Sequence, residues 1–173
     1  EHVSDSNILW LLGKIIASFN SGRESVGLPL GNLTSQLFCN IYMNKFDQFV
    51  KHQLKIKYYL RYADDFVILS TNKVYLEKCI NQILEFLQAK LMLNLHQDKV
   101  YIRTLASGVD WLGWVHFPNH CVLRTATKRR MVKKLMANQN EQAKQSYLGL
   151  LQYGQTYRLT SNINKLFNNQ LAL

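Results

Sequence analysis

The sequence predicts an α+β fold with an antiparallel sheet, and two observations support that class. Segments with apolar residues at helical spacing and short β-prone runs follow one another in the order α-α-β-β-α-β-β-β, before a last helical segment. Neighbouring β-prone runs are joined by short turns, which favours hairpins over a parallel βαβ array. Because 47% of the 173 residues are apolar, the chain can bury a core, and this excludes a disordered or collagen-like protein.

Three helices are predicted from apolar residues that recur with helical spacing. The first covers residues 8–19, with Asp5 or Ser6 as a plausible N-cap. The second covers residues 37–50 and the third residues 73–90.

Strands are predicted where runs of β-branched and aromatic residues replace the helical pattern. These runs cover residues 56–63, 66–70, 99–104, 109–117 and 121–124. The first two form a hairpin, and the last returns across a proline–asparagine turn. The chain after residue 125 is helical again, with Leu, Tyr and Phe among many Asn and Gln residues.

The positive charge of the chain is concentrated in its last third. Of the net charge of +10, residues 1–110 carry +2 and residues 111–173 carry +8. Six basic residues and no acid fall within eleven positions: Arg124, Lys128, Arg129, Arg130, Lys133 and Lys134. Such a cluster is typical of a solvated helix face or of a surface that contacts phosphates. The overall excess favours a polyanionic partner.

Several other classes of protein are disfavoured. No apolar run reaches the roughly 18 residues of a membrane span, and no leader opens the chain, so we expect a soluble protein without membrane contact. Three widely spaced cysteines without a CxxC pair predict no disulfide framework, and a reducing cytoplasm is the simplest setting. His116, His120 and Cys121 flank a turn instead of sharing a helical face, which disfavours a metal site there.

The most distinctive local feature is the sequence Tyr62-Ala63-Asp64-Asp65 between two apolar strands. Two adjacent carboxylates repel each other, so an apolar setting is costly unless something neutralises them. One interpretation is an ion pair with Arg61. The other is a site for divalent cations, because carboxylate oxygen is a ligand that Mg²⁺ prefers.

A second feature is the loop over residues 27–36, which reads Gly-Leu-Pro-Leu-Gly-Asn-Leu-Thr-Ser-Gln. A glycine-containing loop that leads into a helix capped by Thr34 or Ser35 offers free backbone N–H groups to an anion. It is not a Walker A loop, because no Gly-Lys-Ser/Thr follows. The alternative is an ordinary loop-to-helix connection.

Together, the two segments resemble the catalytic palm of a reverse transcriptase. Residues 62–65 are similar to the Tyr-x-Asp-Asp block of that family, and residues 31–36 to the block that shapes the nucleotide pocket. Leu-Asn-Leu at 93–95, followed by Lys99, is similar to the next block. Trp-Leu-Gly at 111–113 is similar to the segment that grips the primer.

This resemblance extends from about residue 8 to about residue 135, and it implies a fold and an activity. The fold would be a right-hand polymerase palm, with its C-terminal part over residues 1–123 and a basic helical thumb over residues 124–173. The fingers and the first palm strands would be missing. The activity would be RNA-directed DNA polymerisation with two Mg²⁺ ions, an RNA template, a DNA primer and deoxynucleoside triphosphates.

The resemblance also implies roles for individual residues. Asp64 and Asp65 would hold the metal, with Asp64 as the more direct ligand, and Lys99 would neutralise or protonate the leaving pyrophosphate unless it is a solvated surface lysine. The residues implied for nucleotide binding are Gly31, Asn32, Ser35, Gln36 and Tyr62. The residues implied for primer and template binding are Trp111, Leu112, Gly113, Arg124, Lys128, Arg129 and Arg130.

The sequence of residues 30–36, Leu-Gly-Asn-Leu-Thr-Ser-Gln, most resembles that of the reverse transcriptases of diversity-generating retroelements. Group II intron and retron enzymes usually carry Gln-Gly at the start of this block and Ser-Pro at its end. The subtype implies error-prone copying, a small basic accessory protein and a bacterial, archaeal or phage-encoded cytoplasmic enzyme.

One departure from the family is that its metal site needs a further aspartate from an earlier block, which nothing in this sequence matches. The sequence also starts at Glu1 and not at a methionine. Both observations lead us to expect a fragment that is inactive alone. The alternative is a non-catalytic RNA-binding palm–thumb module.

Overall fold

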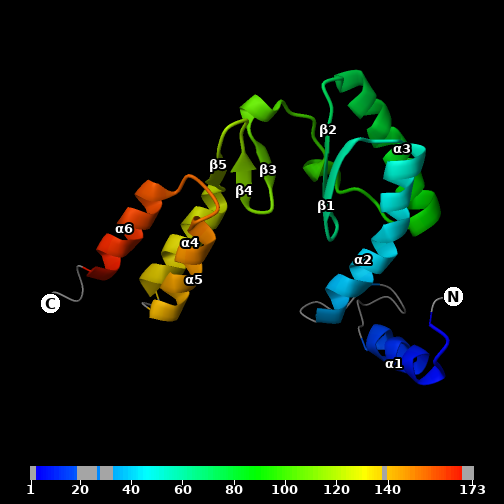
Figure 1. The fold of residues 1–173 in the computed structure, drawn as a ribbon, viewed down its shortest axis with the longest axis horizontal. Coiled ribbons are helices and arrows are strands. Elements are labelled where there is room, and N and C mark those ends of the chain that lie inside the picture. The colour runs from blue at the N-terminus through cyan, green and yellow to red at the C-terminus, as the bar shows by residue number, and fades with distance from the viewer. Residues whose placement is uncertain (1–2, 19–26, 28–32, 138–139, 169–173) are drawn as a thin grey trace. The chain divides into compact units, whose positions relative to one another are not determined.

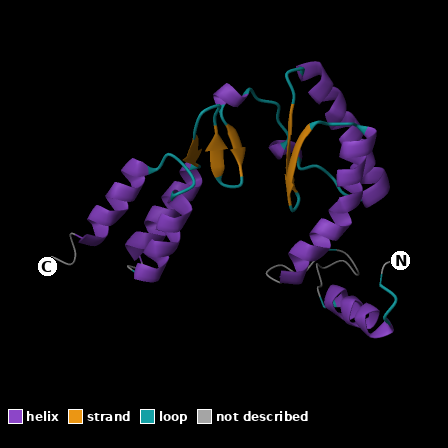
Figure 2. Cartoon of the chain, viewed as in Figure 1, coloured by secondary structure: helices purple, strands orange, loops and turns teal. Residues whose placement is uncertain are grey.

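The chain combines helices with small antiparallel sheets, which confirms the predicted α+β class (Figure 2). The computed structural model describes residues 3–18, 27, 33–137 and 140–168 (Figure 1). The chain divides into two compact units, Glu1–Val100 and Tyr101–Leu173.

Helix α1 (Ser6–Ala17) begins as predicted. The Asp5 carboxylate accepts the backbone N–H groups of Asn7 and Ile8 at 2.8 and 3.1 Å, so Asp5 is the N-cap. None of the α1 residues is buried.

Helix α2 (Leu33–Gln48) starts before Thr34 and Ser35, so both residues lie in its first turn and the prediction that one of them caps the helix was wrong. A π-helical turn, Phe49–Gln53, continues α2. Helix α3 (Lys73–Leu91) matches its predicted range within one residue. Among the described residues, no helix has both the length and the apolar character that crossing a bilayer requires.

Strands β1 (Tyr58–Tyr62) and β2 (Asp65–Leu69) form the predicted hairpin, with Tyr62 paired to Asp65 at its end. One hairpin face is half-buried against the helices, while Tyr58, Leu60 and Tyr62 on the other face are exposed. Tyr59, Phe66 and Ile68 pack against the buried core of this unit: Met43, Phe46, Phe49, Val50, Ile56, Cys79, Ile83, Leu87 and Leu91. The aromatic side chain of Phe46, on α2, has no exposed surface and contacts the rings of Tyr59 and Phe66 in the hairpin and of Phe86 in α3.

The strand predicted over residues 99–104 was wrong. Two 3-10 turns, Gln97–Lys99 and Leu105–Ser107, flank an extended segment that pairs with no strand among the described residues. Its β-branched and aromatic residues suit a strand, but a strand exists only where a neighbour completes the hydrogen-bond ladder. The Tyr101 hydroxyl instead donates to the backbone oxygen of Asp110 at 3.0 Å.

The single strand predicted over residues 109–117 is in fact two strands. β3 (Val109–Trp111) and β4 (Trp114–His116) fold back at Leu112-Gly113, where both residues have positive φ, 52° and 85°. These are the signs of a type I′ hairpin turn, and Leu is unusual at its first position. β5 (Cys121–Leu123) returns across the predicted turn and completes the order β3-β4-β5.

Helices α4 (Thr125–Ala137), α5 (Glu141–Leu151) and α6 (Tyr157–Asn168) make up the predicted helical tail (Figure 1). They share one hydrophobic core with the three-stranded sheet: Trp114, Leu123, Met131, Leu135, Leu151 and Ile163. Because of this shared core, the structural division falls at residue 100 rather than at residue 123, and the palm–thumb boundary of the family remains a prediction.

Candidate active site

The two candidate carboxylates lie at the tip of the β1–β2 hairpin. Tyr62 pairs with Asp65, so Ala63 and Asp64 form a two-residue turn. Ala63 has a φ of 52° whereas φ at Asp64 is not positive, and this combination of signs belongs to a type II′ turn. That turn favours glycine at its first position, so alanine there is strained by about 1–2 kcal/mol.

Both carboxylates are open to solvent. Asp64 and Asp65 are exposed, and Tyr62 beside them has 57% of its surface exposed. No ion pair joins either aspartate to a basic side chain in the part of the chain that the structure describes. Two exposed carboxylates without a cationic partner are a donor set that suits a hard divalent cation, as part of its coordination shell.

The ion pair considered between Arg61 and these aspartates was wrong. Arg61 lies on the inner face of β1, and its side chain is only 10% exposed. It bonds Asp47 of α2 in a bidentate manner, from Nε to Oδ1 at 2.7 Å and from Nη2 to Oδ2 at 2.6 Å. The acid that neutralises Arg61 is therefore on a helix behind the hairpin.

The Arg61 guanidinium also reaches the turn itself. Its Nη1 donates to the backbone oxygen of Ala63 at 2.6 Å and to Oδ1 of Asn40 at 3.1 Å. Asn40 and Asp47 are seven residues apart on α2, which puts them on one helix face. One arginine thus ties a strand, a helix and the turn that carries Asp64.

The contacts around Arg61 shift the pKa values of the neighbouring titratable groups. Bonding to Arg61 lowers the pKa of Asp47, although partial burial opposes this. Burial, and then the hydrogen bond that its hydroxyl donates to Asp47 Oδ1 at 2.7 Å, raises the pKa of Tyr59. Burial raises the pKa of the Cys39 thiol on α2, and the charge of Asp64 raises it further. Asp47 is accordingly a carboxylate and Tyr59 a neutral phenol at neutral pH.

The residues predicted to bind the nucleotide are only partly described. Gln36 is exposed and Ser35 half-buried in the first turn of α2. Gly31 and Asn32 lie outside the described residues. Lys99 is exposed and ends the 3-10 turn Gln97–Lys99 in the same compact unit as Asp64.

The predicted primer segment lies in the second unit. Trp111 pairs with Trp114 across the β3–β4 turn, whose Leu112 is 42% exposed. Among the described side chains, Trp111 has the one buried polar atom, Nε1, that lacks a hydrogen-bond partner. Arg124 bonds the Asp110 carboxylate through Nε, at 2.7 Å, and through Nη2, so an acid of its own sheet already holds it.

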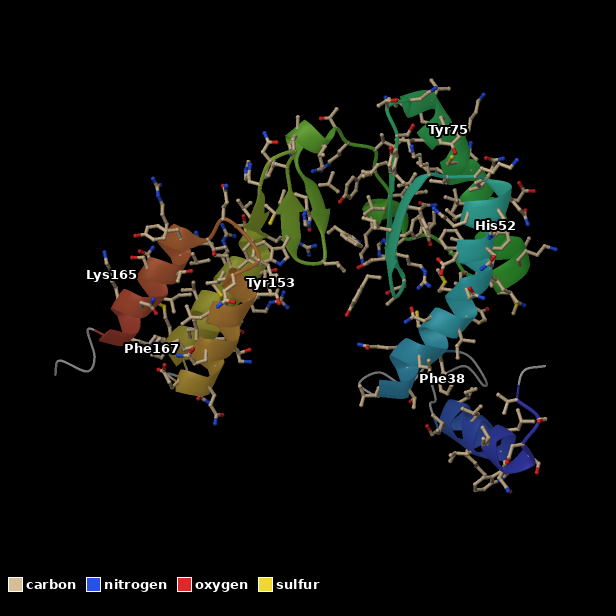
Figure 3. The ribbon with its side chains drawn as sticks, viewed as in Figure 1. Phe38, His52, Tyr75, Tyr153, Lys165 and Phe167 are labelled. Carbon is tan, nitrogen blue, oxygen red and sulfur yellow. The ribbon has the colours of Figure 1, made fainter. Side chains whose placement is uncertain are left out.

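The remaining predicted phosphate contacts are exposed on α4. Lys128 and Arg129 line a shallow groove of about 680 Å³, together with Thr125, Val132, Lys133, Met136 and Ala137. Arg130 is exposed outside that groove. On the neighbouring helices, Lys144 Nζ lies 4.8 Å from the ring centroid of Phe167, which connects α5 to α6 (Figure 3).

The sequence of the chain matches a known family of enzymes. A family model described as reverse transcriptase (RNA-dependent DNA polymerase) matches residues 9–116, more than half of the chain. The chain therefore belongs to the reverse transcriptase family, whose members are nucleotidyltransferases that bind an RNA template, a primer and deoxynucleoside triphosphates. Reverse transcriptase domains generally use divalent metals such as Mg²⁺. The comparison with curated proteins found no match.

The roles of Asp47, Asn40 and Tyr59 could not be predicted from the sequence. In the sequence, Asp47 stands out only because it does not fit the order of the family's blocks. A usable signal exists in retrospect: an acid and an amide seven residues apart on a helix, followed by an inward-facing arginine on the next strand.

Proposed function

We propose that the chain is the catalytic palm and thumb part of an RNA-directed DNA polymerase that works by template-directed nucleotidyl transfer. The primer 3′-hydroxyl attacks the α-phosphate of a deoxynucleoside triphosphate, and pyrophosphate leaves. The observation that supports this is the pair of exposed carboxylates, unpaired by described cations, at a hairpin tip inside the segment that matches the family.

The residues at the tip of the β1–β2 hairpin would have different roles. Asp64, in the turn, would bind the metal directly, and Asp65, in the hairpin ladder, would support the site. Bound Mg²⁺ ions would stabilise the negative charge on the attacking and leaving oxygens. Tyr62 would pack near the primer end, and Lys99 would meet the leaving pyrophosphate.

Nucleotide and nucleic-acid contacts would come from both units. Gly31, Asn32, Ser35 and Gln36 would line the nucleotide pocket. Trp111, Leu112 and Gly113 would position the primer. Lys128, Arg129 and Arg130 would hold the template–primer backbone without reading sequence, and Arg124 would have to share its guanidinium with Asp110.

We further propose that the chain is a reverse transcriptase of the diversity-generating retroelement subtype, because of the sequence of residues 30–36. A small basic accessory protein would be a partner of such an enzyme. A group II intron or retron enzyme is the alternative within the family, and a non-catalytic RNA-binding module the alternative outside catalysis.

Asp64 and Asp65 would supply only part of the metal site. Groups of three or more metal-binding side chains are absent from the described residues, and no block of this sequence resembles the one that carries the family's further aspartate. We therefore expect no nucleotide incorporation by these 173 residues alone. Mg²⁺-dependent incorporation by the isolated chain would contradict that expectation.

The proposal is tested by primer extension with Asp64→Asn in a primer-extending protein that contains these 173 residues. Because a metal ligand supports several kcal/mol of transition-state stabilisation, we expect a loss of about 10³-fold in rate. Glu77→Gln removes an exposed carboxylate from α3, whose one ion pair among the described residues is with Lys73, and serves as the matched control. Undiminished synthesis by Asp64→Asn would contradict the proposed mechanism, whereas RNA binding without synthesis, unaffected by Asp64→Asn, would favour the non-catalytic module.

A further inference from the structure

We propose that Arg61 is a positioning residue, which fixes the direction of the Asp64 carboxylate by holding the central peptide of the β1–β2 turn. The catalytic consequence rests on the proposed function, whereas the structural consequence does not. The proposal starts from the hydrogen bond between Arg61 Nη1 and the Ala63 backbone oxygen, at 2.6 Å.

The arginine is itself held firmly. Its Nε and Nη2 bond both oxygens of Asp47, and its Nη1 bonds Asn40 as well as the turn. Four of the five guanidinium N–H bonds are thereby used in one buried, planar arrangement. Helix α2, which carries both partners, is anchored by the fully buried Phe46.

The bonded oxygen belongs to the peptide that joins Ala63 to Asp64, and this peptide decides the type of the turn. Rotation of that peptide converts a type II′ turn, with positive φ only at Ala63, into a type I′ turn, with positive φ at both residues. Both types suit the twist of a two-residue hairpin, and aspartate tolerates the left-handed region. The rotation would turn the Ala63 oxygen away from Arg61 and redirect the Asp64 side chain. Arg61 therefore selects one of two available turns.

Asp47 allows Arg61 to select the turn type without forming an ion pair with Asp64 or Asp65. A buried arginine without an acid partner would be drawn to the nearest carboxylate, which at this hairpin is on the turn. Because Asp47 neutralises Arg61 from α2, the guanidinium can hold the turn through a backbone oxygen and leave Asp64 and Asp65 unpaired by it.

The structural test uses Arg61→Lys in the full chain, since lysine keeps the charge but lacks the fork that reaches both Asp47 and Ala63. The measurement is NMR residual dipolar couplings within the central peptide, of the Asp64 N–H bond and between the Ala63 carbonyl carbon and the Asp64 amide proton, which report the orientation of that peptide. We expect these couplings to change in Arg61→Lys and to stay as in the wild type in Tyr59→Phe. The Tyr59 variant is the matched control, because it removes a bond to the same Asp47 and leaves the Arg61 bond to Ala63. Unchanged couplings in a folded Arg61→Lys would overturn the proposal.

If Arg61→Lys does not fold, Arg61→Gln combined with Asp47→Asn replaces the ion pair by neutral amides and avoids an unpaired buried charge. The same couplings are then expected to change, and wild-type values would again overturn the proposal. In a protein that extends primers, we expect kcat to fall by about 10²-fold, with the KM for the nucleotide nearly unchanged, because the carboxylate is misplaced and the nucleotide pocket is not. A rise in KM at constant kcat would contradict the assignment. Loss of activity in Asp64→Asn tests the proposed function separately.

Discussion

Ala63 shows how one strained residue is tolerated beside a candidate metal-binding carboxylate. Its positive φ costs about 1–2 kcal/mol relative to glycine. A hydrogen bond from a charged donor contributes about 1.5–3 kcal/mol, so the Arg61 bond to the Ala63 oxygen can offset that strain. Backbone strain of this kind is concentrated at sites where geometry matters for function.

The strain predicts that Ala63→Gly makes the chain more stable. Glycine adopts positive φ freely, so we expect a gain of about 1 kcal/mol in the free energy of unfolding, even after the greater entropy of glycine in the unfolded chain. Ala89→Gly, at an exposed position of α3, is the control and should lose about 0.5–1 kcal/mol. Urea unfolding measures both, and a loss of stability in Ala63→Gly would refute the strained turn.

At this scale the sequence predicts where the candidate carboxylates lie, at the end of a hairpin, but not which residues support that turn. The Asp-Asp pair in a turn between apolar strands can be recognised because the residue types and their neighbours are contiguous. The bond from Arg61 to Asp47 joins residues 14 apart on a strand and a helix, and it depends on how α2 packs behind the hairpin. Local patterns do not contain that packing, which explains why a pair with Asp64 or Asp65 was the nearest available interpretation.

The elements of the second unit are joined by the loop between α5 and α6. Its Gln155 N–H donates to the backbone oxygen of Cys121 at 3.0 Å, and the Cys121 thiol donates to the backbone oxygen of Tyr153 at 3.3 Å. Gly154 lies between them, directly against the Trp114 ring. These contacts dock the loop onto β4 and β5 and explain why the sheet and the helices share one core.

The close approach predicts that Gly154→Ala destabilises the chain. The added Cβ would lie 2.2 Å from Cζ3 of Trp114, and overpacking of this kind costs about 1–3 kcal/mol. Gly149→Ala in α5 is the matched control, since nothing lies within 4 Å of its added Cβ and alanine favours a helix by about 0.5–1 kcal/mol. Thermal unfolding should therefore shift in opposite directions for the two variants. Equal shifts would mean that the loop is not docked on Trp114.

The helices and the first hairpin could be predicted because their periodicity and turn residues are local. The two errors in the predicted strands arose where tertiary context decides. Residues 99–104 have strand-forming side chains but no neighbouring strand among the described residues, and Leu112 takes a positive φ that its residue type does not favour. Because leucine is not a typical turn residue, the sequence pattern of β3 and β4 predicts one long strand instead of two.

On the scale of the whole molecule, charge separates the two compact units. The second unit, residues 101–173, carries +8 of the net +10 and contains two acids, Asp110 and Glu141, which pair with Arg124 and Lys144. The matched family binds an RNA template and a primer, both polyanions. The exposed cations of α4 form no ion pairs among the described residues, whereas Arg124 is held by Asp110.

This distribution predicts that binding to an RNA–DNA hybrid depends on the cations of α4 rather than on net charge alone. The triple variant Lys128→Gln, Arg129→Gln and Arg130→Gln should lower the affinity. It should also reduce the slope of log K against log salt by about 0.9 for each phosphate that the helix no longer neutralises. Fluorescence anisotropy across a salt series measures both quantities.

The control removes the same three charges from α3, as Lys73→Gln, Lys78→Gln and Lys90→Gln, all exposed positions of the first unit. Because both variants lower the net charge from +10 to +7, long-range attraction falls by a similar amount in each. Direct phosphate contacts differ, and the slope reports contacts through the counterions they release. A smaller slope in the α4 variant alone would place the duplex against α4, whereas equal losses in the two variants would show that the basic helix acts only through the overall field of the protein.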